Sequence, residues 1–574
     1  MITYRIQPAE LRAHQFEVTL TVPQPAAEQQ LSLPVWIPGS YPVREFARHL
    51  SQLRARQGTH EVPLQQLDKT TWLARCPGTA ALTVSYRVYA FDNSVRAAWL
   101  DAQRGFFNGT SVCLRVHGRE DEPHRVQLAG LPRGWSVATA MRPVDGKALA
   151  FECVDYDELI DHPVELGAFW RGDFSVRGVP HAFVVAGAWP GFDGERLLAD
   201  AQKICEAQMA FWHGRGKPPF DRYVFMLNAV DDGYGGLEHR ASTALIASRR
   251  DLPRQGNGWQ PGDGYITLLG LISHEYFHTW NVKRLKPTEF ASYDLTRENP
   301  TQLLWFFEGF TSYYDDLLLR RAGLIDDARY LQLLGKTASQ VWATPGRRVQ
   351  SVAQASFDAW TKYYRPDENT ANATVSYYTK GALVALCFDL TLRAAGGSLD
   401  GAMRRLWALK RPIAEDDIRA AFAAEAGRAL DAEFAAWVHG TDDLPLPRLL
   451  AAVGVEWQEQ KATAGQALGL RAGDNGGAVK VQAVMRGSLA ERTGLAAGDE
   501  LIGLDGWRLR KADDLGLLWQ PGRAARWLVA RDQRLLTLNS PADAPAGAGA
   551  IALSWRTDAD EARRAAARAW LDGR

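Results

Sequence analysis

Two histidines and a glutamate stand close together in the middle of the chain, in the order His274-Glu275-Tyr276-Phe277-His278. On a helix, residues four positions apart lie on one face, so both imidazoles can reach a single cation. The glutamate between them then falls beside the cation, near a water molecule in its open position. This spacing indicates a metal site that activates water for hydrolysis.

A third candidate ligand, Glu308, follows a strongly apolar and aromatic stretch, Leu303-Leu304-Trp305-Phe306-Phe307. An ionised carboxylate is costly there unless it is paired or bound to a metal; the alternative is an ordinary glutamate at a domain surface. With His274 and His278 it completes a His-His-Glu set that leaves the fourth position of a zinc site open. Metals that take only oxygen ligands do not suit two imidazoles. We therefore predict one catalytic Zn²⁺ per chain, with Glu275 as the general base.

Hydrophobic spacing indicates which elements must position these groups. Residues 1–165 show short alternating stretches separated by turns such as Pro38-Gly39-Ser40, which is typical of a β-sandwich. Further along, the spacing becomes mostly helical. We expect a strand at 222–227 and helices at 196–212, 265–280, 300–321, 377–395 and 557–571. The fold class is therefore a multidomain α+β protein.

We predict four parts from these shifts in pattern. They are a β-rich N-terminal domain at 1–165, a mostly helical catalytic domain at 166–455, a second β-rich module at 456–545 and a C-terminal helical tail at 546–574.

Composition bears on the partners of the protein and on its cellular location. The 66 basic residues balance 66 acidic ones, so nothing indicates binding to nucleic acid or to an anionic membrane. No apolar run approaches the ~18 residues that a membrane helix needs. The five cysteines are odd in number and form no C-x-x-C pair, which favours reduced thiols in a cytosolic protein. The start of the chain shows no signal-peptide pattern. We expect a cytoplasmic location, or a periplasmic one if a leader has been removed.

Two longer motifs, H-E-Y-F-H-T-W-N-V-K-R at 274–284 and W-F-F-E-G-F-T-S-Y-Y at 305–314, resemble the glycyl aminopeptidase family of gluzincin metallopeptidases. The resemblance spans nearly the whole chain and is weakest in the N-terminal region and the tail. It implies a β-rich N-terminal domain, a thermolysin-like catalytic domain and a C-terminal PDZ domain. It also implies His274, His278 and Glu308 as zinc ligands and Glu275 as the base.

The segment Gly235-Gly236-Leu237-Glu238-His239 is similar to the Gly-x-x-Glu exopeptidase motif of the wider aminopeptidase N-like clan. The resemblance implies that the strand backbone binds the peptide and that Glu238 pairs with the free α-ammonium of the substrate. His239 departs from the usual asparagine, which leaves its own role open. The alternative for Glu238 is a solvated loop carboxylate.

The segment Tyr377-Tyr378-Thr379-Lys380-Gly381 resembles the Tyr-x-Lys-Gly segment of the same clan. This implies that Tyr378 donates a hydrogen bond to the oxyanion, with Tyr377 as the second candidate and simple packing as the alternative. The family resemblance also implies a preference for small N-terminal residues, glycine and alanine. Aromatic residues such as Phe307 or Tyr313 could close a pocket of that size.

Residues 484–506 look like part of a PDZ domain, with glycines at the turns around a short helix. Leu468, Gly469 and Leu470 occupy the place of the loop whose N–H groups cap a peptide C-terminus. Because this loop departs from the fuller glycine-rich form, peptide binding and a packing role both stay open.

Three hypotheses follow. The first is a zinc aminopeptidase that acts on peptides with a free N-terminus, and the second is a zinc oligopeptide endopeptidase. The third is a non-catalytic PDZ scaffold with a relict metal site, against which the intact Glu275 counts.

Overall fold

The computed structural model describes residues 1–256, 258–542 and 547–573. The chain folds as two compact units, Met1–Asn299 and Pro300–Arg574. A β-rich N-terminal part and a helical part confirm the predicted multidomain α+β class. The finer boundaries at 165, 455 and 545 stay a prediction.

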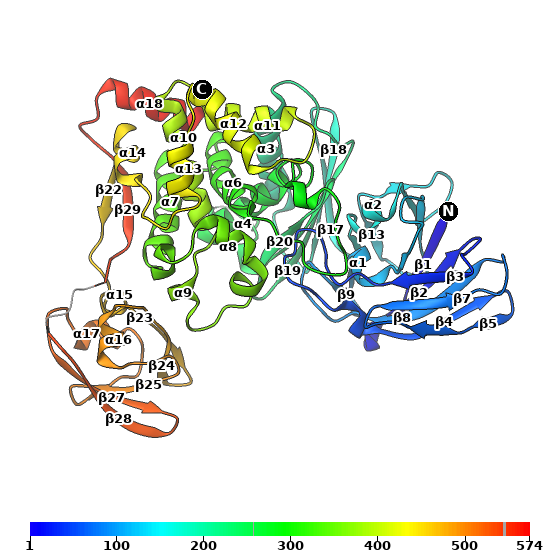
Figure 1. Cartoon of the computed structure of the whole chain (residues 1–574), viewed down its shortest axis with the longest axis horizontal. Coiled ribbons are helices and arrows are strands. Elements are labelled where there is room, and N and C mark those ends of the chain that lie inside the picture. Colours follow the sequence, from blue (N-terminus) through cyan, green and yellow to red (C-terminus); the bar gives the residue numbers. More distant parts are fainter. Residues whose placement is uncertain (257, 543–546, 574) are drawn as a thin grey trace. The chain divides into compact units, whose positions relative to one another are not determined.

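Alternating apolar residues build the large sheet that opens the first unit. Its central strands β12 (His124–Leu128), β1 (Ile2–Glu10), β2 (Gln15–Val22) and β8 (Leu82–Tyr89) lie side by side in that order, and β1, β2 and β8 are labelled in Figure 1. In β2 every second residue is buried, as a half-buried strand requires. The sheet is completed by β4 (Leu50–Gln57), β5 (His60–Val62), β14 (Arg142–Pro143) and β15 (Ala150–Cys153).

Two smaller sheets and two short helices accompany this large sheet. One sheet contains β9 (Ala98–Leu100), β10 (Arg104–Phe107), β13 (Ser136–Ala138) and β16 (Val164–Gly167). The other contains β3 (Glu28–Ser32), β6 (Leu64–Gln66), β7 (Thr71–Arg75) and β11 (Arg115–Val116). The helices are α1 (Gly109–Val112) and α2 (Tyr156–Ile160).

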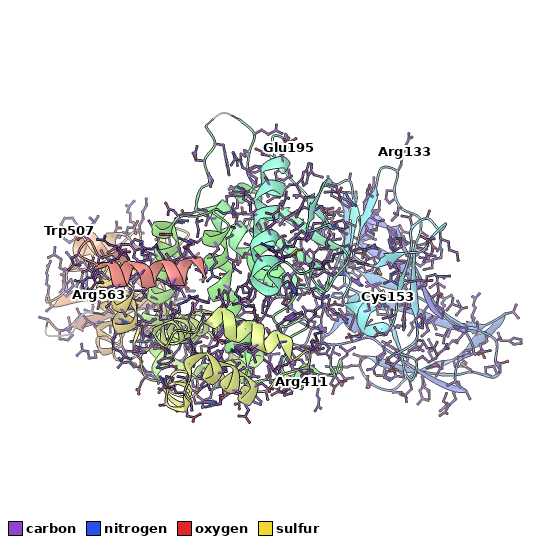
Figure 2. All side chains as sticks on the ribbon, turned by 90° about the horizontal axis from the view of Figure 1, so that it is seen from above. Arg133, Cys153, Glu195, Arg411, Trp507 and Arg563 are labelled. Atoms are coloured by element: carbon purple, nitrogen blue, oxygen red, sulfur yellow. The ribbon has the colours of Figure 1, made fainter. Side chains whose placement is uncertain are left out.

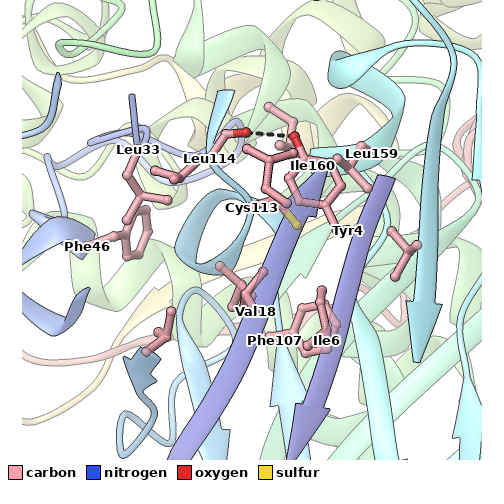
Figure 3. Close-up of a cluster of buried hydrophobic side chains, with 14 of the residues drawn as sticks. Tyr4, Ile6, Val18, Leu33, Phe46, Phe107, Cys113, Leu114, Leu159 and Ile160 are labelled. Atoms are coloured by element: carbon pink, nitrogen blue, oxygen red, sulfur yellow. Dashed lines mark hydrogen bonds between the residues drawn. The ribbon is translucent and has the colours of Figure 1, made fainter. Parts of the chain in front are cut away.

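Three buried tyrosines hold one segment of backbone inside the N-terminal core. The Tyr4 hydroxyl donates to the Leu114 carbonyl at 2.6 Å, a bond drawn in Figure 3 beside the buried Cys113. Tyr86 and Tyr156 donate to the two preceding carbonyls, those of residues 112 and 113, at 2.8 and 2.7 Å. Buried hydroxyls and carbonyls are costly without partners, so these bonds fix the segment.

A fourth sheet of the first unit has the strand order β17 (Trp170–Val176), β18 (Val179–Ala186), β19 (Tyr223–Val230), β21 (Ser242–Ser248) and β20 (Tyr234–Glu238). β18, β19 and β21 run parallel, whereas β20 is antiparallel to β21 and forms an edge. The unit also contains α3 (Gly194–His213) and α4 (Asp263–Phe277), which pack together. A sheet edge beside a buried helix positions the candidate site.

The second unit is mostly helical. Its helices before the C-terminal module are α5 (Leu304–Phe307), α6 (Gly309–Arg321), α7 (Asp327–Trp342), α8 (Val352–Phe357), α9 (Thr370–Ala373), α10 (Thr379–Ala394), α11 (Leu399–Ala408), α12 (Glu415–Ala426), α13 (Asp431–Trp437) and α14 (Leu446–Ala452). The helix expected at 300–321 is divided at Glu308, and the one expected at 377–395 begins only at Thr379.

Among the described residues no single helix is long and apolar enough to cross a membrane. Only α10 and α11 together meet that length and composition, with a bend of 102°.

A small β module is inserted near the end of the second unit. Its sheet has the order β23 (Leu470–Asn475), β24 (Ala478–Val484), β25 (Glu500–Leu504), β27 (Ala525–Arg531) and β28 (Arg534–Ser540), and β26 (Trp507–Arg508) pairs with β25. The accompanying helices are α15 (Ala464–Leu468), α16 (Leu489–Thr493) and α17 (Asp514–Leu518). The chain enters by β22 (Val455–Glu459) and leaves by β29 (Ile551–Trp555), which pair antiparallel. Trp507, labelled in Figure 2, is 70% exposed on this module.

The tail helix α18 (Glu561–Asp572) is anchored in the helical part of the second unit. Asp560 caps it by accepting from the Arg563 N–H at 2.9 Å. The indole of Trp570 is fully buried and donates to the Tyr313 hydroxyl at 2.8 Å. The tail is therefore part of the core and not a loose extension.

Candidate active site

His274 and His278 lie on one face of the end of α4. Their Nε2 atoms are 3.0 Å apart, and the two rings meet edge to face with centroids 4.6 Å apart. The backbone N–H of His278 still donates to the His274 carbonyl at 3.2 Å, so the helical turn that joins the pair is intact. The predicted spacing therefore brings the two imidazoles to one point.

The ring of His278 is oriented by the turn that follows the helix. Its Nδ1 lies 2.7 Å from the Asn281 carbonyl, which leaves Nε2 for a metal. Val282 has φ +119°, a conformation that a β-branched residue rarely adopts. Such strain persists only where the surroundings impose it. On the other side of Val282, the Lys283 ammonium binds Asp161 at 2.7 Å with both groups buried, and this anchor holds the strained turn.

Asp161 is the centre of a buried cluster of charges. It accepts from Arg240 Nε at 2.8 Å and lies 3.4 Å from His239 Nδ1. Burial alone would raise the pKa of Asp161, but Lys283 and Arg240 hold it well below its usual range. Burial lowers the pKa of His239 to about 4, so this ring is neutral at pH 7. His239, which replaces the usual asparagine, thus belongs to the support of the strand end.

The edge strand β20 passes directly over the proposed base. A Cβ at Gly236 would lie 2.1 Å from Glu275 Oε1, so only glycine fits at this position. Gly235 has φ +150°, which also favours glycine. Glu275 is 5% exposed. The two glycines therefore allow the backbone of an edge strand to approach a buried carboxylate.

Glu238 is the last residue of β20 and is 4% exposed. It is therefore not the solvated loop carboxylate of the alternative reading. Thr243 Oγ1 donates to the Leu237 carbonyl at 3.1 Å, and the His239 N–H donates to the Ser242 carbonyl at 3.0 Å, so the backbone around Glu238 is fixed.

In the second unit, Glu308 is 3% exposed and stands between α5 and α6. The next residue, Gly309, packs against Gly381 of α10: a Cβ at Gly309 would lie 2.5 Å from the Gly381 Cα. The same Cβ would lie 2.8 Å from the Tyr377 carbonyl. Two glycines therefore let α6 and α10 touch, which brings Glu308 and the tyrosine pair together.

The two candidate tyrosines precede α10 and differ in exposure. Tyr377 is fully buried, and burial, then Tyr364 and Glu308, raise its pKa well above the ordinary value. Tyr378 is half-buried, and its hydroxyl lies 3.0 Å from that of Tyr364. Because an oxyanion donor must reach the substrate, this difference supports Tyr378 over Tyr377.

Among the residues that the structure describes, one group could hold a metal ion: His274, His278 and Glu308 offer three ligand atoms that all lie within 4.8 Å of one another. Two imidazole nitrogens and a carboxylate oxygen are a donor set that suits catalytic zinc. The residues present thus fit the metal that their types predict. The candidate ligands His274, His278 and Glu308, the candidate base Glu275 and the two candidate tyrosines all precede the C-terminal module in the chain.

The three residues of the predicted peptide groove form the end of a helix and the start of a strand. Leu468 ends α15, Gly469 caps it in the left-handed region, and Leu470 begins β23. The Gly469 N–H already donates to the carbonyls of Gln466 and Gly465. That group therefore has partners within the chain.

Several residues that bear on the site were not singled out from the sequence. They are Gly39, Arg96, Asp161, Lys283 and Tyr364. The turn Pro38-Gly39-Ser40 was visible as a turn, but nothing local showed what it contacts.

A buried glutamate beside two histidines on one helix, with a second carboxylate in reach as the third ligand, defines a metal-dependent hydrolase. Two family models match the chain: the Peptidase M61 N-terminal domain at residues 3–168 and M61 glycyl aminopeptidase at residues 267–384. The crystal structure of an aminopeptidase N family protein from Idiomarina loihiensis is 36% identical and covers 100% of both chains, with a TM-score of 0.92. The chain belongs to the M61 glycyl aminopeptidase family and is a peptidase.

More distant structures are also similar. An M1 zinc metallopeptidase from Deinococcus radiodurans is 15% identical over 78% of this chain and 95% of that one, with a TM-score of 0.47. Aminopeptidase A of Legionella pneumophila is 11% identical over 94% of this chain and 56% of that one, with a TM-score of 0.48. Similarity at this level carries no conclusion about activity. No curated protein matches the chain.

Proposed function

We propose that the protein is a zinc-dependent aminopeptidase that removes glycine and alanine from the N-termini of peptides. One observation carries the proposal: β20 presses Gly236 against Glu275 and, two residues later, ends at the buried Glu238. Two residues of strand span about 7 Å at ~3.3 Å each. That spacing suits one substrate residue, with its α-ammonium at Glu238 and its scissile peptide bond beside Glu275.

Each group then has a role in the reaction. His274, His278 and Glu308 would hold one zinc ion, which when bound supplies a Lewis acid for the scissile carbonyl and for water. Glu275 takes a proton from the attacking water and passes it to the leaving amine. Tyr378 donates a hydrogen bond to the carbonyl oxygen as it becomes negative. The edge strand β20 aligns the peptide as an added strand.

The preference for small residues rests on the family description, glycyl aminopeptidase. Of the two aromatic residues considered as pocket walls, Tyr313 donates to Asp389 at 2.6 Å and accepts from Trp570. Both bonds hold the Tyr313 hydroxyl within the helical core and anchor the tail helix, so we exclude it as a pocket wall. Phe307 is fully buried one residue before Glu308 and stays the candidate.

Metal analysis and a substrate panel test the proposal together. Purified protein is expected to contain one zinc ion per chain, and a chelator is expected to abolish hydrolysis until zinc is restored. Among free aminoacyl fluorogenic substrates, glycyl and alanyl derivatives are expected to give the highest kcat/KM. Protein without stoichiometric metal contradicts the zinc assignment. Equal cleavage of N-acetylated peptides favours the endopeptidase.

Replacing Tyr378 by phenylalanine is expected to lower kcat by about 100-fold, the usual effect of removing one oxyanion donor. Zinc content is expected to stay at one per chain, because Tyr378 is not a ligand. Tyr377→Phe is the matched control: it removes a hydroxyl from the adjacent, fully buried ring and is expected to alter Tm more than kcat. A larger loss of kcat in Tyr377→Phe contradicts the assignment of Tyr378.

We also propose that residues 456–545 form a PDZ domain. The support is a small antiparallel sheet with short helices, in which buried Asp499 accepts from the Ala496 N–H and binds Arg531 at 2.7 Å. Since the Gly469 N–H already has partners, binding of a peptide C-terminus at Leu468–Leu470 would require this turn to rearrange. Titration with C-terminal peptides, free and amidated, tests this.

Excision of the module is expected to leave hydrolysis of small substrates within about threefold of wild type, because the proposed ligands, base and tyrosine lie outside it. Truncation at residue 456 is unsuitable, since it also removes β29 and the buried α18. Glu459 and Ile551 are directly paired, so an Asn-Gly turn can replace residues 460–550 and close a β22–β29 hairpin.

One contact between the module and the rest of the second unit needs its own control. Asn372 donates to the Val484 carbonyl and accepts from the Arg486 N–H, both at 2.8 Å. Asn372→Ala in the full chain removes only this link. An excised protein that folds and binds zinc but is inactive would contradict the prediction, and loss of activity in Asn372→Ala as well would locate the cause at that contact.

A further inference from the structure

A tight turn of the N-terminal region lies against the proposed ammonium-binding carboxylate. The Ser40 N–H donates to the Ile37 carbonyl at 3.0 Å, and Gly39 has φ +92°. With Pro38 at the second position and glycine at the third, this is a type II β-turn. Proline presets the first corner and glycine alone adopts the second without strain, so the sequence specifies the turn.

The glycine of this turn touches the Glu238 carboxylate. A Cβ built at Gly39 would lie 2.6 Å from Glu238 Oε1, 2.8 Å from Cδ and 2.8 Å from Oε2. All three carboxylate atoms are therefore in contact with one backbone position. Two features therefore require glycine at position 39: its backbone is in the left-handed region, and no side chain fits against the carboxylate.

The turn is held firmly in place by bonds on both of its flanks. The Val35 N–H donates to the Leu295 carbonyl at 2.9 Å, and the Arg44 N–H donates to the Val35 carbonyl at 2.7 Å. Arg44 Nε also donates to Ser40 Oγ at 3.1 Å. The turn cannot withdraw from Glu238 without breaking these bonds, so it acts as a fixed wall.

Packing fixes the turn from a further side. The Trp36 ring packs on Phe290 and Tyr293, with centroids 6.3 and 5.3 Å away. Trp36, Ile37 and Ser40 are each 1% exposed or less. The wall therefore belongs to the core of the first unit.

A second arm of the N-terminal region reaches the same strand. Arg96 Nη2 donates to the Gly236 carbonyl at 3.1 Å. The N-terminal region thus contacts β20 both above the base and at the Glu238 carboxylate. These two contacts come from separate segments of the N-terminal region, so its packing against β20 does not depend on a single residue.

We propose that the turn Ile37–Ser40 is the closed end of the subsite for the substrate α-ammonium and that Gly39 positions the Glu238 carboxylate. The turn lies directly against the carboxylate, so a chain that extended past the α-ammonium at Glu238 would meet the turn. The N-terminal region thereby makes the site an exopeptidase site. This inference rests on the proposed aminopeptidase function and deepens it.

Gly39→Ala tests the proposal with free and N-acetylated glycyl substrates. The added methyl group displaces the Glu238 carboxylate but leaves its charge in the protein. We therefore expect kcat/KM for the free substrate to fall by about 10-fold or more, which is less than the loss expected when the carboxylate is removed. Hydrolysis of the acetylated substrate and zinc content are expected to change less than about twofold, since Gly39 contacts neither the ligands nor the base. Gly118→Ala is the matched control, with φ +80° and nothing within 4 Å.

A double-mutant cycle with Glu238→Ala separates positioning from general damage. If Gly39 acts through Glu238, Gly39→Ala in the Glu238→Ala background is expected to cost less than about twofold. Equal losses in both backgrounds, or unchanged discrimination in Gly39→Ala, overturn the proposal. If Gly39→Ala does not fold, Pro38→Ala is the variant to measure, because it loosens the turn without placing a new atom at Glu238. Unchanged discrimination between free and acetylated substrates in that variant also overturns the proposal. Wild-type protein that does not discriminate refutes the aminopeptidase function itself.

Discussion

Replacement of Glu275 by glutamine is expected to lower kcat by about 10²- to 10⁴-fold, the usual size of a general-base contribution. The amide has nearly the same shape as the carboxylate but cannot take a proton from water. Glu275 is 5% exposed and lies against Gly236, so the shape must be conserved for the variant to be informative. Zinc content and Tm are expected to stay close to wild type, because the proposed ligands are unchanged.

Steady-state kinetics with glycyl and alanyl substrates measures this effect. Glu289→Gln is a suitable control, since it makes the same substitution at an exposed position in the same part of the chain. Wild-type kcat in Glu275→Gln, with zinc bound, would mean that another group removes the proton. Loss of zinc in the variant would instead mean that the carboxylate contributes to metal binding.

The imidazole pair could be predicted from the sequence because its geometry is local. Residues four apart on a helix face one way whatever surrounds the helix. The cost of an isolated carboxylate in an apolar segment likewise identified Glu308, and the structure groups it with His274 and His278. These inferences need only short-range rules.

The backbone at Glu308 and at the tyrosines could not be predicted in the same way. The apolar pattern at 300–321 suggested one helix, but the helix is interrupted at Glu308, next to the contact between Gly309 and Gly381. That contact joins residues far apart in the sequence, and tertiary packing overrides local propensity there. For the same reason the helix after Tyr378 begins two residues later than its pattern indicated.

The environment of Glu238 is the clearest limit of sequence reasoning. The turn at Gly39 was recognisable as a turn, and Glu238 as a candidate carboxylate, yet nothing local indicated that one lies on the other. The Lys283–Asp161 pair is a similar case, since Lys283 is simply a basic residue after the zinc motif until its burial is known. Long-range contacts of this kind decide how a site is closed and supported.

N-acetylation of the substrate is expected to reduce kcat/KM by roughly 30-fold to several thousand-fold. An ammonium paired with a buried carboxylate accounts for about 2 to 5 kcal/mol when one partner is removed. Glu238 is 4% exposed, so its charge is little screened by solvent and an unpaired state is costly. The measurement compares glycyl and alanyl peptides with and without the acetyl group at equal enzyme concentration. Comparable rates for both would favour the endopeptidase.

Replacing Glu238 by alanine is expected to remove most of this discrimination. Free substrates lose the charge partner, so their kcat/KM falls by a similar factor, whereas acetylated substrates, which never used it, change little. Glu238→Gln keeps the size and removes only the charge, and is expected to behave like the alanine variant if the ion pair is responsible. Because neither substitution changes the proposed zinc ligands or Glu275, bound zinc and slow hydrolysis of acetylated peptides should persist. Normal discrimination in both variants would mean that a different carboxylate holds the amine.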